Sequence, residues 1–153
     1  MQKLALALIL ALGVALGTLW TVVGTSSPAG PLNEVVIERS SDGHFYVDGS
    51  VNGHSVRFLV DTGAGVVALT EEDAAAAGLK AEAASFGVIG EGPSGIVRGK
   101  FVTFDKLAIK GFAPADVKGA VVEGASVSLL GQPFLDRLDE IIIRKEVMIL
   151  RYS

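Results

Sequence analysis

The sequence predicts an all-β, barrel-like domain with one or two short helices, preceded by an apolar N-terminal helix. Three observations lead to this fold class. Many short segments rich in β-branched residues alternate with tight-turn signals. Only two short segments have the composition of a helix, so the strands must supply most of the core. The chain has 153 residues, which is enough for one domain with a modest core.

The composition excludes several classes of function. The net charge is −4 and the basic residues are scattered, so no nucleic-acid-binding surface is expected. The chain has no cysteine, which excludes disulfides and thiolate chemistry. The two histidines, His44 and His54, lie in an expected hairpin without a suitably spaced set of acids. We therefore expect no metal site and no cofactor.

The N-terminal residues Leu4–Val23 are uncharged and long enough to cross a membrane. Lys3 is the only basic residue before Arg39, which places the N-terminus in the cytoplasm and the remainder on the periplasmic or extracytoplasmic side. A cleaved signal peptide is the alternative, but the apolar run is long and the cleavage pattern after it is poor. We expect a single-pass membrane protein with an anchor at residues 1–24, a linker at 25–32 and a folded domain at 33–153.

The strands of this domain begin with a hairpin. The segments His44–Val51 and His54–Val60 alternate apolar and polar residues, and Asn52-Gly53 between them is a strong two-residue turn signal. The second of these strands ends at the position before Asp61. Further strands are expected at Val35–Glu38, Phe101–Ile109, Val117–Val122, Glu140–Arg144 and Val147–Tyr152.

Two short helices and one glycine-rich hairpin complete the expected elements. Thr70–Gly78 has a capping threonine, three acidic residues after it and a terminal glycine, as a helix requires. Ser126–Leu138 reads as a buried strand that breaks at Gly131 into a helix. Phe86–Gly99 contains five glycines and a proline, which predicts a mobile hairpin. It does not fit a phosphate-binding loop, because the Gly-Lys-Ser/Thr ending is missing.

The stretch Phe58–Thr70 carries the clearest candidate for chemistry. Two apolar runs flank Asp61-Thr62-Gly63-Ala64, so both ends of this turn are expected to be held in the core. A carboxylate there needs hydrogen bonds to offset its desolvation, and the Gly63 backbone N–H and the Thr62 hydroxyl can support the turn. A solvated aspartate in an ordinary turn is the simpler interpretation, and the tripeptide alone does not decide between the two.

Three features in order carry a resemblance to a known family. They are the apolar lead-in Leu59-Val60, the Asp61–Ala64 motif, and the Leu-Leu-Gly-x-x-Phe-Leu-x-x-Leu run at Leu129–Leu138. Together with the glycine-rich hairpin, they make the chain resemble the retropepsin-like aspartic proteases, in particular their membrane-anchored bacterial branch. The resemblance covers roughly Val35–Leu150 and implies the closed, barrel-like acid protease fold.

The resemblance implies a role for each matching position. Asp61 would be the catalytic carboxylate, with Thr62, Gly63 and Ala64 supporting the active-site loop. Leu129, Leu130 and Gly131 would pack beneath that loop in a structural role. The glycine-rich hairpin would be a flap over the substrate, with its tip at Gly90, Glu91, Gly92, Pro93, Ser94 and Gly95.

Two positions depart from the family pattern. Relatives often have Ser or another polar residue at Gly65, whose side chain can bond the outer carboxylate oxygen. The flap of this chain also lacks an aromatic residue at its tip, so substrate contacts there are not carried over.

Peptide hydrolysis by an aspartic protease requires two carboxyl groups around one water. One takes a proton from the attacking water, and the other polarises the carbonyl. Two close carboxyls in such enzymes share one proton. The chain contains one Asp-Thr-Gly, and about 120 folded residues cannot hold two lobes of this kind. The implied protein is therefore a homodimeric, membrane-anchored aspartic endopeptidase that acts on a peptide or protein substrate.

Two other functions remain open on the sequence. One is a non-catalytic peptide-binding module of the same fold, although such a binder has no need of an intact Asp-Thr-Gly. The other is an unrelated small β-domain with a structural role in the cell envelope, in which Asp61 only caps a turn.

Overall fold

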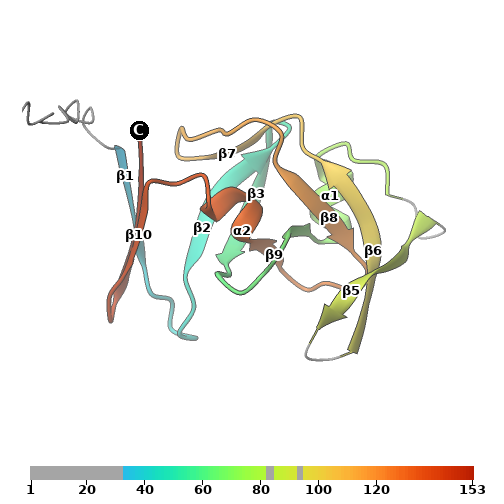
Figure 1. The fold of residues 1–153 in the computed structure, drawn as a ribbon, viewed down its shortest axis with the longest axis horizontal. Coiled ribbons are helices and arrows are strands. Elements are labelled where there is room, and N and C mark those ends of the chain that lie inside the picture. The colour runs from blue at the N-terminus through green and yellow to red at the C-terminus, as the bar shows by residue number, and fades with distance from the viewer. Residues whose placement is uncertain (1–32, 82–84, 93–94) are drawn as a thin grey trace, which may run out of the picture.

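The computed structural model describes residues 33–81, 85–92 and 95–153. Its elements are β1 (Asn33–Glu38), β2 (Tyr46–Val51), β3 (His54–Val60), β4 (Val67–Leu69), α1 (Glu71–Ala76), β5 (Gly87–Gly92), β6 (Gly95–Thr103), β7 (Leu107–Ile109), β8 (Lys118–Val122), β9 (Ser128–Leu130), α2 (Gln132–Leu135), β10 (Glu140–Ile143) and β11 (Val147–Tyr152). The strands form a three-stranded sheet of order β1-β11-β10 and an eight-stranded sheet of order β5-β6-β8-β4-β9-β3-β2-β7 (Figure 1). Over these described ranges the fold is therefore mostly β with two short helices, as expected for the folded domain.

The expected closed barrel is not formed by the described strands. The end strands of the large sheet, β5 and β7, are not paired with each other within the described ranges. β1 does not close the sheet either, because it pairs over its full length, Asn33–Glu38, with β11. Its link to the β2 hairpin is a single bridge between Arg39 and Phe45. The N-terminal and C-terminal strands thus satisfy each other's backbone groups and form a separate small sheet.

The expected N-terminal anchor, Leu4–Val23, lies outside the described residues. Within residues 33–81, 85–92 and 95–153, no helix has both the length and the apolar character needed to span a membrane.

The β2–β3 hairpin forms as the sequence predicts. Asn52 and Gly53 both have positive φ, 51° and 88°, which the two central residues of a type I′ turn require. The Asn52 side chain also joins neighbouring segments, since its Nδ2 donates to Ala77 O at 3.3 Å and its Oδ1 accepts from Lys106 N at 3.1 Å. The alternating apolar residues of both strands are buried, namely Val47, Val51, Val56, Phe58 and Val60.

Strand β3 brings the Asp61 turn next to the C-terminal motif. It lies between β2 and β9 in the large sheet and runs parallel to β9, with Val60 beside Leu130. Because parallel strands end at the same edge of a sheet, the residues that follow them, Asp61 and Gly131, lie at that edge together.

The helices follow their expected start and stop signals. The Thr70 hydroxyl accepts a hydrogen bond from Asp73 N at 3.1 Å and caps α1. Gly78, just beyond the helix, has a φ of +72°, which explains the need for glycine there. α2 begins directly after Gly131, as the break in the Ser126–Leu138 segment predicted.

One expected strand, Phe101–Ile109, is divided in the structure. Its first part belongs to β6, which pairs with β8, and its last part is β7, which pairs with β2. Between them Phe104 is buried and its N–H donates to Val117 O at 3.1 Å. The chain turns near Phe104 because the two parts of the expected strand, in β6 and β7, pair with different strands of the large sheet, β8 and β2.

Candidate active site

The backbone of Asp61 is fixed on both sides. Its N–H donates to Leu130 O in β9 at 3.1 Å, and its carbonyl accepts from Ala64 N at 3.2 Å. The first bond extends the parallel β3–β9 ladder by one residue, and the second closes the turn. The side chain is half-buried, so the carboxylate is held in place and still reaches solvent.

Gly63 supplies the hydrogen bond that the sequence predicts for the carboxylate. Its backbone N–H donates to Asp61 Oδ1 at 2.9 Å. A Cβ at Gly63 would lie 3.3 Å from the same oxygen, which is closer than an ordinary contact. Glycine at this position therefore lets the backbone approach the carboxylate.

Thr62 is held through its backbone. Its carbonyl accepts from Gln132 Nε2 at 2.6 Å, while its side chain is exposed. Within the described residues, the hydroxyl does not brace the loop in the way that the sequence suggested.

The C-terminal motif packs directly beneath the loop. A Cβ on Gly131 would overlap Val66 O and lie 2.6 Å from Ala64 O. The next residue donates its backbone N–H to Ala64 O at 2.9 Å. That residue, Gln132, therefore holds the loop by both its backbone and its side chain, a role the sequence analysis missed. Its position inside the Leu-Leu-Gly-x-x-Phe run was the available signal.

One row of side chains crosses the large sheet on the face that carries Asp61. Successive strand pairings align Tyr46, Leu59, Leu129, Ala68, Ala120 and Phe101, from β2 to β6. Asp61 lies two residues beyond Leu59 in β3, so the alternation of side chains brings it to the same face. We call these six residues the cross-sheet row; Leu129 belongs to it, whereas Leu130 points into the core and is fully buried.

The glycine-rich hairpin is formed by β5 and β6, which pair with an irregularity between Val88 and Gly90. Gly90 and Glu91 are exposed, and Gly92 and Gly95 close the described part of the hairpin. The expected tip residues Pro93 and Ser94 lie outside the described residues. β5 is the edge strand, five strands from β3, so this single chain does not bring the hairpin next to Asp61 through its sheet pairing (Figure 1).

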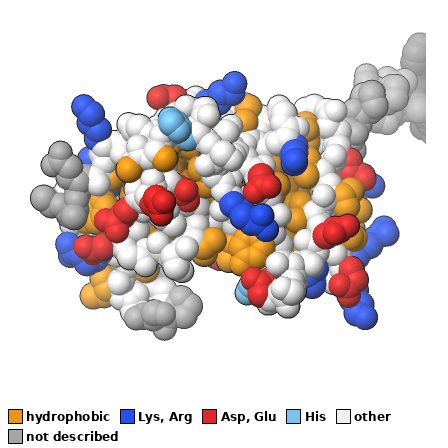
Figure 2. Space-filling model, turned by 180° about the vertical axis from the view of Figure 1, so that it is seen from behind, with side chains coloured by type: hydrophobic (Ala, Val, Ile, Leu, Met, Phe, Trp, Pro, Cys, Tyr) orange, Lys and Arg blue, Asp and Glu red, His pale blue; other side chains and the backbone are white. Residues whose placement is uncertain are grey.

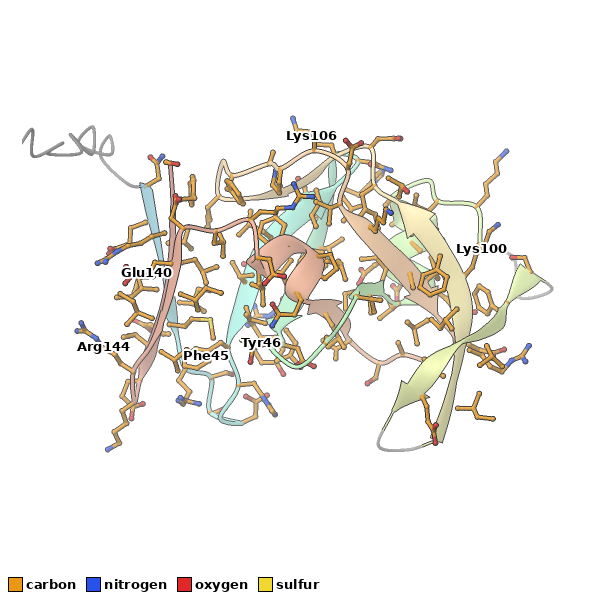
Figure 3. The ribbon with its side chains drawn as sticks, in the orientation of Figure 1. Phe45, Tyr46, Lys100, Lys106, Glu140 and Arg144 are labelled. Carbon is orange, nitrogen blue, oxygen red and sulfur yellow. The ribbon has the colours of Figure 1, made fainter. Side chains whose placement is uncertain are left out.

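Asp42 and Tyr46 are an interacting pair of ionisable groups at the start of β2. The His44 backbone N–H, at 3.0 Å, and the Tyr46 hydroxyl, at 2.9 Å, hold the pKa of Asp42 below its ordinary value. The same contact with Asp42 raises the pKa of Tyr46. Figure 3 shows Tyr46 at the start of β2, next to Phe45. Among the described residues, no three His, Asp or Glu side chains are grouped so that they could hold a metal ion.

The surface does not concentrate charge of one sign on the face shown in Figure 2. Acidic and basic side chains are interspersed there, with hydrophobic side chains between them. Two larger hollows border the sheet. One, of about 540 Å³, is lined by residues of β2, β3 and α1 together with Ala125–Ser128. The other, of about 500 Å³, borders Gly65 and Val66, directly after the Asp61 turn.

Comparisons with known proteins agree on one family. Residues 47–137 match the family model described as "gag-polyprotein putative aspartyl protease". The structure is similar to the crystal structure of a retropepsin-like aspartic protease from Rickettsia conorii, with a TM-score of 0.67 and 32% identity, covering 80% of this chain and 93% of that one. It also shares the fold of the EIAV protease in complex with the inhibitor HBY-793, with a TM-score of 0.52 and 20% identity, covering 65% and 91% of the two chains.

Two curated proteins are similar in sequence. An uncharacterized protein of Rickettsia prowazekii (strain Madrid E) is 34% identical over 122 residues, and an uncharacterized protein of Sinorhizobium sp, from the cobV 5′ region, is 32% identical over 120 residues. The matches cover 79% and 77% of this chain but 52% of each relative. The chain thus spans about half the length of the curated relatives it matches.

Proposed function

The chain belongs to the retropepsin-like aspartic proteases, and we propose that it is an aspartic endopeptidase whose active site combines Asp61 from two copies of the chain. The observation that carries this proposal is the geometry of Asp61. Its carboxylate accepts the Gly63 N–H at 2.9 Å and remains half-exposed directly after β3, whose inward-facing residues are buried. This arrangement fixes the direction of the carboxylate and leaves it open to a water and a second carboxyl group.

The requirement for a second copy follows from the chemistry. Peptide hydrolysis of this type needs one carboxylate as general base and one carboxylic acid as general acid. The chain has one Asp-Thr-Gly, so a symmetric homodimer supplies the partner Asp61 across a twofold axis. The exposed Thr62 side chain supports this assembly, because its hydroxyl is free to contact the second active-site loop.

In the proposed enzyme, Thr62, Gly63 and Ala64 form the active-site loop. Leu129, Leu130 and Gly131 support it from below, together with Gln132. The β5–β6 hairpin acts as the cover over the bound peptide in the assembled dimer. Its glycines give it the conformational freedom that a cover needs.

The proposed location is the membrane. The apolar length of Leu4–Val23 and the single basic residue before it support a retained single-pass anchor with a cytoplasmic N-terminus. The protease domain then lies on the periplasmic or extracytoplasmic side. Anchoring two chains in one membrane raises their effective concentration and favours the dimer.

The first test is the substitution Asp61→Asn. It keeps the shape of the side chain but removes its negative charge and its capacity to exchange a proton. Cleavage of a peptide library should fall by roughly a hundredfold or more, as expected for a lost acid–base group. The dimer should persist, because repulsion between the two carboxyl groups is relieved. Wild-type activity should be highest at acidic pH, because one carboxyl must carry a proton while the other is ionised.

Asp48→Asn is the matched control, because Asp48 is an exposed aspartate followed by a glycine and its nearest ion-pair partner, Arg57, is 3.9 Å away. It should cleave like the wild type. Equal activity of the Asp61→Asn and wild-type proteins, with the same pH profile, would show that Asp61 is a turn residue. If the protein binds peptides without cleaving them, and does not respond to a statine-type inhibitor, the result would favour the non-catalytic peptide-binding module instead.

A further inference from the structure

The β5–β6 hairpin leaves the body of the large sheet at Arg98. Residues Gly99–Thr103 of β6 pair with β8 and so belong to the interior of the sheet. Within the described residues, the part of β6 from Gly95 to Arg98 pairs with β5 alone. The hairpin therefore extends beyond β8, as Figure 1 shows. A hairpin that is attached only at its base can change its orientation about that base.

The pairing of β5 with β6 is irregular at the same level. Val88 lies opposite Arg98 and Gly90 lies opposite Val97, so Ile89 is an extra residue in β5. An extra residue on one strand bends that strand and interrupts the ladder of hydrogen bonds. The base of the hairpin is therefore also the place where its edge strand bends.

Glycines on the two strands serve different purposes here. A Cβ at Gly99 would overlap Val121 O and lie 2.8 Å from Ile89 Cδ1, so glycine lets β6 pack closely on β8. A Cβ at Gly87 or Gly90 would meet nothing within 4 Å, and neither residue has a positive φ. Packing does not require glycine at these two positions, and what it contributes there is backbone freedom. A tightly packed attachment thus adjoins a strand that bends readily.

The side chain of Arg98 spans this hinge. Its Nη2 donates to Phe86 O at 2.9 Å, directly before β5, and the Phe86 side chain is buried in the core. Its Nε donates to Glu123 Oε2 at 3.0 Å, directly after β8. The Glu123 backbone N–H in turn donates to Arg98 O at 3.0 Å. One residue of β6 therefore joins the start of β5 to the end of β8.

The two side-chain bonds together require an arginine. An exposed ion pair contributes little by itself, and the side chains of Arg98 and Glu123 are 51% and 43% exposed. The bond to Phe86 O is partly buried and comes from the same guanidinium. A planar guanidinium donates in two fixed directions at once, whereas the ammonium of lysine is a single point charge on a flexible stem.

We propose that Arg98 is a positioning residue that fixes the orientation of the β5–β6 hairpin relative to β8, and so determines how firmly a bound peptide is held. The inference rests on the proposed function, because that function makes the hairpin the cover over the peptide. The apparent dissociation constant rises as the fraction of protein in the binding orientation falls. Arg98 therefore acts on peptide binding more than on the chemical step.

The first experiment measures the hinge without catalysis. Hydrogen exchange of the full chain is followed at the Glu123 amide, whose bond to Arg98 O crosses the hinge. Arg98→Gln should accelerate exchange there by about threefold to tenfold, because the charged donor is lost. Arg98→Lys, which can keep one of the two side-chain bonds, should lie between Arg98→Gln and the wild type.

Arg57→Gln is the matched control for this experiment. Arg57 is also an arginine in the middle of a strand, and its ion pair with Asp48 is exposed. Its loss should leave exchange at the Glu123 amide unchanged. Glu123→Gln removes the ion pair but leaves the bond from Arg98 to the Phe86 carbonyl. Its effect should be smaller than that of Arg98→Gln, and the two effects should not add in the double variant.

The second experiment measures cleavage by the full chain of a peptide that the wild type cleaves, chosen from the library. Arg98→Gln should raise KM by about threefold to tenfold and leave kcat within about twofold. Arg57→Gln should change neither constant. A purely structural role of Arg98 would instead reduce the amount of folded enzyme, which lowers the apparent kcat and leaves KM unchanged.

The two experiments separate the two proposals. Unchanged exchange at the Glu123 amide in Arg98→Gln, or an unchanged KM despite faster exchange, overturns the inference even if the chain is a protease. A wild-type chain that cleaves no peptide contradicts the proposed function, and the exchange result still decides whether Arg98 restrains the hairpin.

Discussion

At the scale of single residues, Gly131 determines how closely the C-terminal motif approaches the Asp61 turn. Its φ of −100° is open to any residue, so its backbone conformation does not require glycine. What requires glycine is the approach of two carbonyl oxygens, those of Ala64 and Val66, to the place where a Cβ would lie. A side chain there would push the loop away from β9 and disturb the direction of Asp61.

We expect Gly131→Ala to destabilise the domain by about 1–3 kcal/mol, because the new methyl group overlaps backbone atoms that cannot rotate away. Urea unfolding followed by circular dichroism measures this change. Gly65→Ala is the matched control in the same loop, since its Cβ would meet nothing within 4 Å. It should leave stability unchanged or raise it by up to about 1 kcal/mol, through a less flexible unfolded chain. Equal losses in the two variants would contradict the packing described for Gly131.

At the scale of elements, a buried polar link joins α1 to β9. The Ser128 hydroxyl accepts from Thr70 N at 3.1 Å and donates to Asp73 Oδ2 at 2.5 Å. Ser128 is only 1% exposed, and its two partners, Thr70 and Asp73, are half-buried. Because β9 continues into Leu130 and Gly131, this link also positions the strand that holds Asp61.

Ser128→Ala removes both hydrogen bonds and leaves the Thr70 N–H and the Asp73 carboxylate without that partner. We expect a loss of about 1–3 kcal/mol in the free energy of unfolding, the usual cost of an unsatisfied buried polar group. Ser126→Ala, at an exposed serine two residues earlier, should change it by less than about 0.5 kcal/mol. Denaturant titration of the two variants side by side tests this, and a neutral Ser128→Ala would show that the link contributes nothing to stability.

At the scale of the whole molecule, ion pairs hold the small sheet of β1, β11 and β10 together. Arg151 in β11 forms ion pairs with Glu34 at 2.9 Å and with Glu140 at 2.7 Å, and so ties all three strands together. Figure 3 shows Glu140 and Arg144 projecting away from the large sheet. The Asp61 loop follows β3 of the large sheet, and Thr62 and Gly63 of this loop are exposed.

The proposed shared site predicts that activity depends on protein concentration. A protein that begins at Asn33, and so lacks the proposed anchor, should lose specific activity on dilution as the proposed dimer dissociates. Activity assays over a dilution series, with sedimentation at the same concentrations, measure both quantities. Constant specific activity from a species that sediments as a monomer would rule out the shared site.

The proposed anchor predicts that the mature protein keeps its N-terminus. Intact mass spectrometry of protein purified from membranes should then give the full mass of 15.8 kDa. A protein that starts within residues 25–31 would instead identify the apolar segment as a cleaved signal peptide.

The sequence was most informative where a few neighbouring residues decide the structure. Asn52-Gly53 predicted the hairpin because both residues tolerate positive φ, and Thr70 predicted the start of α1 because its hydroxyl can cap the helix. The sequence also predicted the hydrogen bond from the Gly63 N–H to the Asp61 carboxylate, because the two residues are only two positions apart in the chain. The catalytic role of Asp61 stays a prediction that the Asp61→Asn experiment tests.

Only the tertiary structure decided which distant segments pair. Gln132 holds Thr62 across 70 residues of chain, β1 pairs with β11 instead of closing a barrel, and one expected strand divides between β8 and β2. Backbone preferences act over a few residues, so they fix where strands and turns begin and end. The partner of each strand depends instead on how all the apolar faces pack at once.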